Sequence, residues 1–131
     1  MIVLDTHVLV WWVTGTAALS LRARREIRSA LADGPLHASA ISVLEIATAV
    51  RRRRLNFAIP VEHWLDELAV LPELRFEPVT PHIARVAGSF DDAAPGDPAD
   101  RLIAATALAL GAKLITADGR LRRFSRLQAI W

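Results

Sequence analysis

Several apolar runs in this chain are only three or four residues long, and a carboxylate follows two of them directly. Ile2–Leu4 is followed by Asp5, and the run 114–117 is followed by Asp118. Short, continuous apolar runs are typical of strands buried on both faces of a parallel sheet. Because helical patterns separate these runs, the sequence predicts an α/β fold with a mostly parallel central sheet.

The predicted elements alternate along the chain. Strands are expected at 2–4, 36–38, 74–79, 113–116 and 127–131. Helices are expected at 6–13, 20–32, 40–54, 61–71, 81–90 and 98–111, with a short helical turn at 120–124. Helix starts are marked by Ser20, Thr80-Pro81 and Asp97-Pro98, because a capping side chain or a first-turn proline favours a helix N-terminus. The stretch 90–98 is the one loop rich in turn-forming residues.

Length and composition set the broad class. The chain has 131 residues and is 53% hydrophobic, which predicts one folded domain spanning 1–131. It has no cysteine, which excludes disulfides, thiolate metal sites and cysteine nucleophiles. No apolar run approaches the ~18–20 residues of a membrane span, and the start lacks the pattern of a signal peptide. A cytoplasmic protein without a membrane partner is therefore expected.

Four carboxylates are placed where a folded domain has no structural use for a charge. Each lies beside or within an apolar run: Asp5, Glu45, Asp100 and Asp118. Ionised carboxylates are almost never buried unless they are paired or bind a cation. Ligands of parallel sheets lie beyond the carboxyl ends of the strands, so the acids that follow strands are expected at one edge. A hard divalent cation such as Mg²⁺ is the simplest counter-charge for such a cluster.

Each acid also has a structural interpretation. Asp97 is placed as the N-cap of the helix that follows, and Asp100 falls in its first turn, where the helix dipole favours negative charge. Asp5 can cap the helix after its strand. Glu45 can pair with a neighbouring arginine. These alternatives remain open at the level of sequence.

The charged residues favour a polyanionic partner. Of the sixteen cations, fifteen are Arg and one is Lys113. If Asp97 joins the four acids in one pocket, nine of the fourteen acids remain to balance sixteen bases elsewhere. A negative pocket on a positive body suits a metal-dependent enzyme acting on a polyanion. The alternative is a set of ordinary solvated helix faces with a bias toward arginine.

Four segments together resemble a known family. They are 4–12 (Leu-Asp-Thr-His-Val-Leu-Val-Trp-Trp), 41–46 (Ile-Ser-Val-Leu-Glu-Ile), 97–107, which opens Asp-Pro-Ala-Asp-Arg, and 114–118 (Leu-Ile-Thr-Ala-Asp). These segments resemble the PIN domain, and within it the VapC toxins of bacterial toxin–antitoxin pairs. The likeness extends from Met1 to the C-terminal Ile130-Trp131.

The resemblance implies a five-stranded parallel sheet flanked by helices and a Mg²⁺- or Mn²⁺-dependent endoribonuclease site. Asp5, Glu45, Asp100 and Asp118 match the family's acidic quartet, and Asp97 matches an extra nearby acid. Thr6 and Thr116 match small hydroxyl positions beside the acids, and Ser42 stands one turn before Glu45. One departure is Gly119-Arg120 after Asp118, where no further acid follows.

Roles for these residues follow from their chemistry. Asp5, Asp100 and Asp118 are predicted metal ligands, and Glu45 is predicted to orient or deprotonate the attacking water. Asp97, Thr6, Ser42 and Thr116 are predicted to support the ligands. No side chain need act as the nucleophile, because a divalent ion activates water near neutral pH.

Basic and aromatic residues supply candidates for partner contacts. The cluster closest in sequence to Asp118 is favoured as the RNA-binding group: Arg120, Arg122, Arg123 and Arg126. Arg51–Arg54 either complement a helix C-terminus or contact RNA or an acidic partner. Trp11, Trp12 and Trp64 are expected in core or partner packing, and the four histidines lack zinc spacing and are expected to be structural. The resemblance further implies an RNA substrate, a cognate VapB-type antitoxin and a homodimer.

Two rival functions are weighed. One is a haloacid-dehalogenase-like phosphatase with Asp5 as nucleophile, but that chemistry needs a second Asp at the position of His7. The other is a catalytically silent PIN-like module whose acids bind a structural ion or an arginine of a partner.

Overall fold

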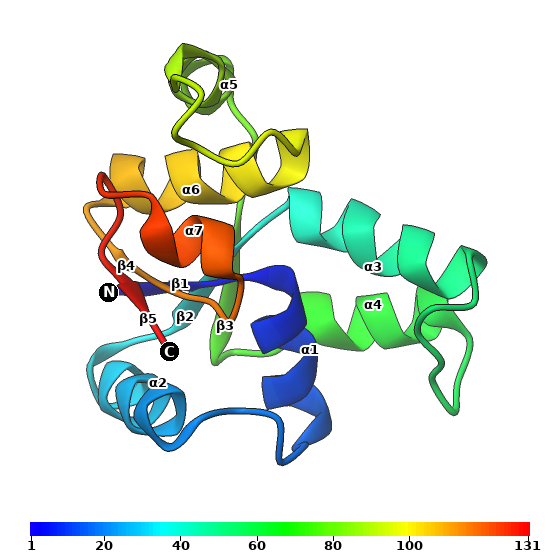
Figure 1. Ribbon diagram of the computed structural model, residues 1–131. Helices are drawn as coiled ribbons and strands as arrows, with labels where there is room; N and C mark the ends of the chain where they lie inside the picture. The colour runs from blue at the N-terminus through cyan, green and yellow to red at the C-terminus, as the bar shows by residue number, and fades with distance from the viewer.

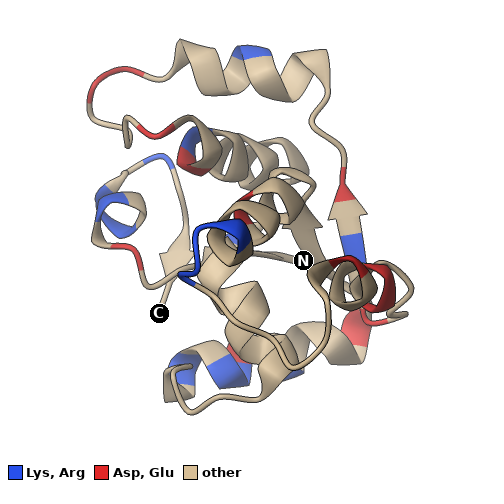
Figure 2. Ribbon diagram, turned by 90° about the vertical axis from the view of Figure 1, so that its right-hand side faces the viewer, with Lys and Arg blue, Asp and Glu red and all other residues tan.

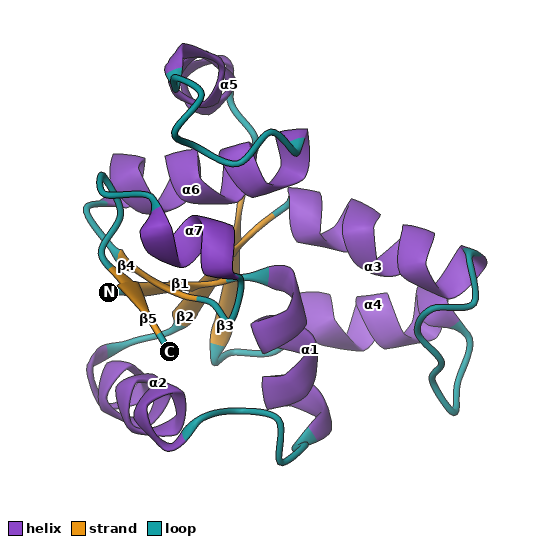
Figure 3. Ribbon diagram, in the orientation of Figure 1, coloured by secondary structure: helices purple, strands orange, loops and turns teal.

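A five-stranded parallel sheet lies at the centre of the protein, and its strand order is β3-β2-β1-β4-β5 (Figure 3). The computed structural model describes all residues from 1 to 131. The strands are β1 (Ile2–Leu4), β2 (Leu36–Ser39), β3 (Leu74–Glu77), β4 (Lys113–Ile115) and β5 (Ala129–Ile130). All four strand pairings are parallel, which confirms the predicted sheet.

Seven helices surround this sheet. They are α1 (Thr6–Thr14), α2 (Leu21–Asp33), α3 (Ile41–Arg51), α4 (Val61–Ala69), α5 (Pro81–Ser89), α6 (Pro98–Leu110) and α7 (Gly119–Arg123). In Figure 1, α5, α6 and α7 lie on one side of the sheet and α1 and α2 on the other. The helices α3 and α4 lie side by side and extend away from the sheet as an arm (Figure 1).

The sheet is buried on both faces, as its continuous apolar strands predict. In β1, Ile2 and Leu4 belong to the core that includes residues of α1 and α2, whereas Val3 belongs to the core that includes residues of α5 and α6. Successive side chains of a strand point to opposite faces, so this one short strand contributes to both cores. β3 is the most exposed strand, since it lies at an edge of the sheet and Leu74 is its only buried residue.

Several predicted elements are shorter in the structure, for identifiable reasons. The strand predicted at 74–79 ends at Glu77, because Pro78 has no N–H to donate. The helix predicted at 40–54 ends at Arg51, because Arg53 adopts a left-handed conformation with φ 59°. The strand predicted at 127–131 is limited to 129–130, since the Leu127 N–H is bonded within a turn to the Phe124 carbonyl.

The strand order sets the place of a ligand. From β1 the chain moves outward through β2 and β3 on one side, while β4 and β5 pair on the other, so the order reverses between β1 and β4. In open parallel sheets the crevice at such a reversal, at the carboxyl ends of the strands, is where ligands bind. No helix is both long enough and apolar enough to cross a bilayer.

Candidate metal centre

Two of the predicted site acids lie at this reversal. Asp5 directly follows β1, and Asp118 lies three residues beyond Ile115, the last residue of β4. Because β1 and β4 are paired in parallel, with Leu4 opposite Ile115, both acids emerge at the same edge of the sheet. Asp5 and Asp118 therefore lie at one edge of the sheet, as the sequence predicted.

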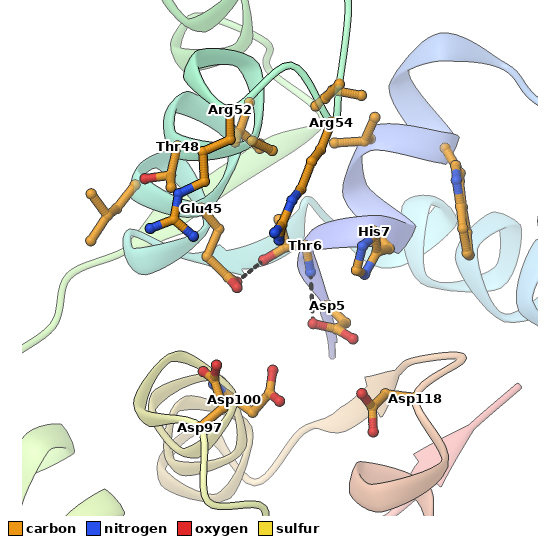
Figure 4. Close-up of a pocket in the computed structure, with 16 residues that line it drawn as sticks. Asp5, Thr6, His7, Glu45, Thr48, Arg52, Arg54, Asp97, Asp100 and Asp118 are labelled. Atoms are coloured by element: carbon orange, nitrogen blue, oxygen red, sulfur yellow. Dashed lines mark hydrogen bonds between the residues drawn. The ribbon is translucent and has the colours of Figure 1, made fainter.

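Three more acids complete a pocket at that edge. Asp97 and Asp100 come from the start of α6, and Glu45 comes from the second turn of α3. Figure 4 shows Glu45 and Asp5 facing Asp97, Asp100 and Asp118 across the pocket. Its volume of about 670 Å³ is large enough for an ion together with part of a substrate.

The tightest group of acids differs from the predicted ligand set. One carboxylate oxygen each from Glu45, Asp97 and Asp100 lie within 4.8 Å of one another. Asp5 and Asp118 line the same pocket but lie outside this group. Asp97 is thus close enough to serve as a direct ligand, whereas the sequence assigned it a supporting role. The ligand set of Asp5, Asp100 and Asp118 stays a prediction.

Three of these acids also cap helices. The Asp97 Oδ1 accepts from the N–H groups of Ala99 and Asp100, and the Asp118 Oδ1 accepts from those of Arg120 and Leu121. Each acid caps its helix through Oδ1 alone, so its Oδ2 stays available to bind an ion in the pocket. Asp5 caps α1 through the Thr6 N–H at 2.8 Å. The capping interpretation and the ligand interpretation are therefore compatible, because each uses a different lone pair.

Hydroxyl groups hold the two innermost acids. The Thr116 hydroxyl donates to Asp5 Oδ2 at 2.7 Å and accepts from the Asp118 N–H at 3.0 Å. The Thr6 hydroxyl donates to Glu45 Oε1 at 2.5 Å and lies 2.8 Å from the Ser42 hydroxyl. Since Thr6 has one hydroxyl proton, Ser42 is the donor to Thr6. Thr6, Ser42 and Thr116 thus lie beside the acids, in the positions from which they were predicted to support the ligands.

The electrostatics of the pocket favour a cation. Burial, followed by the negative charges of neighbouring acids, raises the pKa of the Asp100 carboxyl from 3.8 to about 7. Burial also raises the pKa of Asp5, although the hydrogen bond from Thr116 lowers it. The pKa of Glu45 is raised by burial as well, against the hydrogen bond from Thr6. Carboxylates that repel one another in this way are stabilised by a divalent ion.

No basic side chain neutralises these acids. The protein has three ion pairs, His37–Glu77, Arg75–Glu77 and Lys113–Glu26, and none involves a pocket acid. The pairing of Glu45 with an arginine, which the sequence left open, is therefore absent. The donor set is oxygen only and negatively charged, which fits Mg²⁺ or Mn²⁺.

Two basic residues of the pocket were not singled out as site residues from the sequence. Arg52 and Arg54, just after α3, line the pocket together with the acids (Figure 4). The favoured RNA-binding cluster lies elsewhere. Arg120 and Arg123 line a separate shallow depression beside the loop 92–96, and Arg126 lies over the ring of Phe90 at 5.2 Å. The RNA-binding assignment of Arg120, Arg122, Arg123 and Arg126 stays a prediction.

Histidine and tryptophan positions match their expected roles in part. His37 is buried and bonds Glu77 through Nδ1 at 2.8 Å, as a structural histidine would. His7, in contrast, lines the acidic pocket next to Trp11. Trp11, Trp12 and Trp64 are partly buried against the core.

Comparison with known proteins agrees with this fold. The PIN domain family matches residues 2–127. The chain therefore belongs to the PIN-domain family. It is 40% identical to Ribonuclease VapC22 of Mycobacterium tuberculosis over 132 aligned residues, which cover 99% of this chain and 98% of that protein.

Solved structures share the fold at lower identity. VapBC2 from Rickettsia felis, bound to a DNA fragment from its promoter, superposes with a TM-score of 0.71 at 18% identity, covering 99% of this chain and 98% of the other. A toxin–antitoxin complex from Klebsiella pneumoniae superposes with a TM-score of 0.64 at 18% identity, covering 100% of this chain and 97% of the other. Membership of the PIN family sets aside the phosphatase alternative.

Proposed function

We propose that this protein is a Mg²⁺- or Mn²⁺-dependent endoribonuclease and the toxin of a VapBC-type toxin–antitoxin pair. The observation that carries the proposal is a pocket lined by five carboxylates with no ion-pairing cation, in a PIN-domain chain 40% identical to a protein named a ribonuclease. The RNA of the cytoplasm is its proposed substrate.

The donor set supports a divalent ion. Asp5, Asp100 and Asp118 would hold it, and Asp97 lies close enough to Asp100 to take part. Such an ion, when bound, supplies an activated water and a counter-charge for the scissile phosphate. At neutral pH the ion would also keep the Asp100 carboxyl ionised, although its pKa is about 7 without metal.

The chain's own residues then orient the reaction. Glu45 would accept a proton from the attacking water, and its position in the pocket and its raised pKa support this role. Thr6 fixes the orientation of this carboxylate by donating to Oε1. Attack on phosphorus in line with the leaving 3′ oxygen would yield a 5′-phosphate and a 3′-hydroxyl.

The test is cleavage of a folded hairpin RNA by purified protein, with Mg²⁺, with Mn²⁺ and with EDTA. Asp100→Asn is the most informative variant, because the Asp100 side chain caps no helix. The substitution therefore removes a negative charge from the pocket without removing a helix cap. We expect at least a hundredfold loss of rate with Asp100→Asn or EDTA. Cleavage at the parental rate would overturn the assignment, and metal binding without cleavage would identify a binding module instead.

A protein partner is part of the proposal. The Klebsiella pneumoniae neighbour is a toxin–antitoxin complex, and by analogy of fold this chain would bind a VapB-type antitoxin. The resemblance to the VapC toxins implies a homodimer as well. Co-expression with the protein encoded beside its gene, followed by affinity capture and light scattering, tests both points. A monomer that captures no adjacent gene product would contradict them.

A further inference from the structure

The four consecutive arginines at the end of α3, Arg51–Arg54, differ in whether they line the acidic pocket. Arg52 and Arg54 line the acidic pocket, whereas Arg51 and Arg53 do not (Figure 4). Figure 2 shows this stretch as a continuous basic segment at the end of its helix. A cationic run that only complemented the helix C-terminus would have no reason to place alternate members in an acidic pocket.

The backbone creates this arrangement. The Arg54 N–H bonds the Ala49 carbonyl at 2.8 Å, and the Arg53 N–H bonds the Val50 carbonyl at 3.0 Å. These two bonds, with the left-handed Arg53, form a Schellman motif, whose left-handed position is usually glycine. A left-handed conformation is unfavourable for an L-residue, because its Cβ approaches the following carbonyl oxygen too closely. The turn therefore holds a strained arginine while it directs its two neighbours to the pocket.

Arg52 and Arg54 are not neutralised by the acids opposite them. Neither guanidinium forms an ion pair with a carboxylate of the pocket. In Figure 4 both side chains extend toward the acids from the same wall, Arg52 beside Glu45 and Arg54 above Thr6. Two unpaired guanidinium groups beside a proposed metal centre provide bidentate donors for phosphate oxygens.

We propose that Arg52 and Arg54 bind the backbone phosphates of the RNA strand that flank the scissile bond, and so position the substrate against the acids. This inference rests on the proposed nuclease function and names the residues that hold its substrate. These two contacts would lie nearer the scissile bond than the predicted RNA-binding cluster, because none of Arg120, Arg122, Arg123 and Arg126 lines the acidic pocket.

The test measures RNA binding separately from cleavage. A fluorescein-labelled, single-stranded RNA of about twelve nucleotides is titrated with the Asp100→Asn protein in EDTA, and anisotropy is recorded at several salt concentrations. Adding Arg52→Ala and Arg54→Ala should weaken binding at least tenfold. The slope of log K against log salt should become shallower by about 1.4, since each phosphate contact on a single strand contributes about 0.7.

The chain offers a control of equal charge. Arg51→Ala with Arg53→Gly also removes two cations, and glycine accepts the left-handed conformation of residue 53. If the arginines acted only through net charge, both double variants would change affinity and slope equally. We expect the control to retain most of the affinity. Equal losses in the two variants, or no loss in either, would overturn the proposal.

Cleavage by the protein with intact acids gives an independent measurement. Arg52→Ala with Arg54→Ala should raise KM more than it lowers kcat, because it removes contacts made before the chemical step. Arg52→Lys with Arg54→Lys should restore only part of the affinity, since lysine keeps the positive charge but lacks the planar pair of N–H donors that binds phosphate bidentately. If the two arginines instead hold an acidic segment of a protein partner, RNA affinity and KM will not change. An inactive parent protein that still shows the arginine-dependent binding would refute the nuclease function and not this RNA contact.

Discussion

The Thr116 hydroxyl donates a hydrogen bond of 2.7 Å to Asp5 Oδ2, joining residues that are 111 positions apart in the sequence. The same hydroxyl accepts from the Asp118 N–H. The first contact joins the ends of β1 and β4, the two strands between which the strand order reverses, and the second lies within the segment that follows β4. The relative position of two pocket acids thus depends on one buried hydroxyl.

Thr116→Val should weaken both the fold and the metal site. It leaves a carboxylate that is 5% exposed without its side-chain donor, which should cost about 1–3 kcal/mol of unfolding free energy. Loss of a supporting hydrogen bond should also lower metal affinity or activity by about 10–100-fold. Urea unfolding and Mn²⁺ calorimetry measure the two effects. Thr116→Ser, which keeps the hydroxyl, should show little of either, and an equal loss in both variants would contradict the role of the hydroxyl.

Stability without metal should depend on pH through Asp100. Its pKa is about 7 in the folded protein and near 3.8 when unfolded, so between these values the folded state holds the extra proton. The contribution of this group is therefore fully present below about pH 3.8 and is lost as pH rises through about 7. We expect the thermal midpoint in EDTA to fall between pH 5 and 8, and Asp100→Asn to flatten this part of the curve. An unchanged curve in Asp100→Asn would refute the assignment.

Metal binding should release the proton that the Asp100 carboxyl holds in the metal-free protein. Because the ion binds the ionised carboxylate, affinity for Mg²⁺ should decrease by about tenfold per pH unit below pH 7 if one proton is released. Calorimetry in buffers of different ionisation enthalpy counts that proton directly. Binding that is equally tight at pH 5.5 and 8 would show that Asp100 is not a ligand.

The pair Thr6 and Glu45 should control the acidic limb of the pH–rate profile. Thr6→Val removes the hydrogen bond that lowers the pKa of Glu45, so the limb should move to higher pH. Ser42 is one hydrogen bond further from Glu45, so Ser42→Ala should shift the acidic limb less. Rates from pH 5 to 9 at saturating metal test this order. A larger shift in Ser42→Ala would indicate that the hydroxyl chain runs differently.

Arg101 should be required for the position of α6. Its guanidinium donates to the carbonyls of Ala87 and Pro95, each at 3.1 Å, and to the carbonyl of Phe90. These bonds hold the loop that leads to Asp97. Arg101→Ala should therefore lower the unfolding free energy by roughly 3 kcal/mol and reduce activity with it. Arg101→Lys should recover only part, because lysine cannot reach three carbonyls from one planar group. Full recovery by lysine would show that charge alone matters.

Much of the fold could be predicted because its signals are local. The run Ile2–Leu4 is buried on both faces, and Asp97-Pro98 starts α6 as its capping pattern predicts. The meeting of Asp5 with Asp118 followed from parallel strands and their shared edge. These features depend on residue types that leave the chain few alternatives.

Other features depend on contacts between distant segments or on unusual backbone. The sequence contains no signal that Arg53 takes a left-handed conformation, because glycine is the usual residue there. The end of α3 and the entry of Arg52 and Arg54 into the pocket could not be predicted without it. The Asp118 cap of α7, in contrast, could have been found from an Asp placed just before a short helix.

Asp97 and Asp118 both cap a helix and line the acidic pocket, which limits how the proposed activity can be lost by mutation. Alanine at either position would remove charge and leave helix N–H groups unbonded, so an inactive protein would also be a less stable one. Asn or Ser keeps a capping oxygen at both positions. An inactive homologue that still folds is therefore expected to carry neutral capping residues at positions 97 and 118. Position 100, whose side chain caps no helix, would be free to vary.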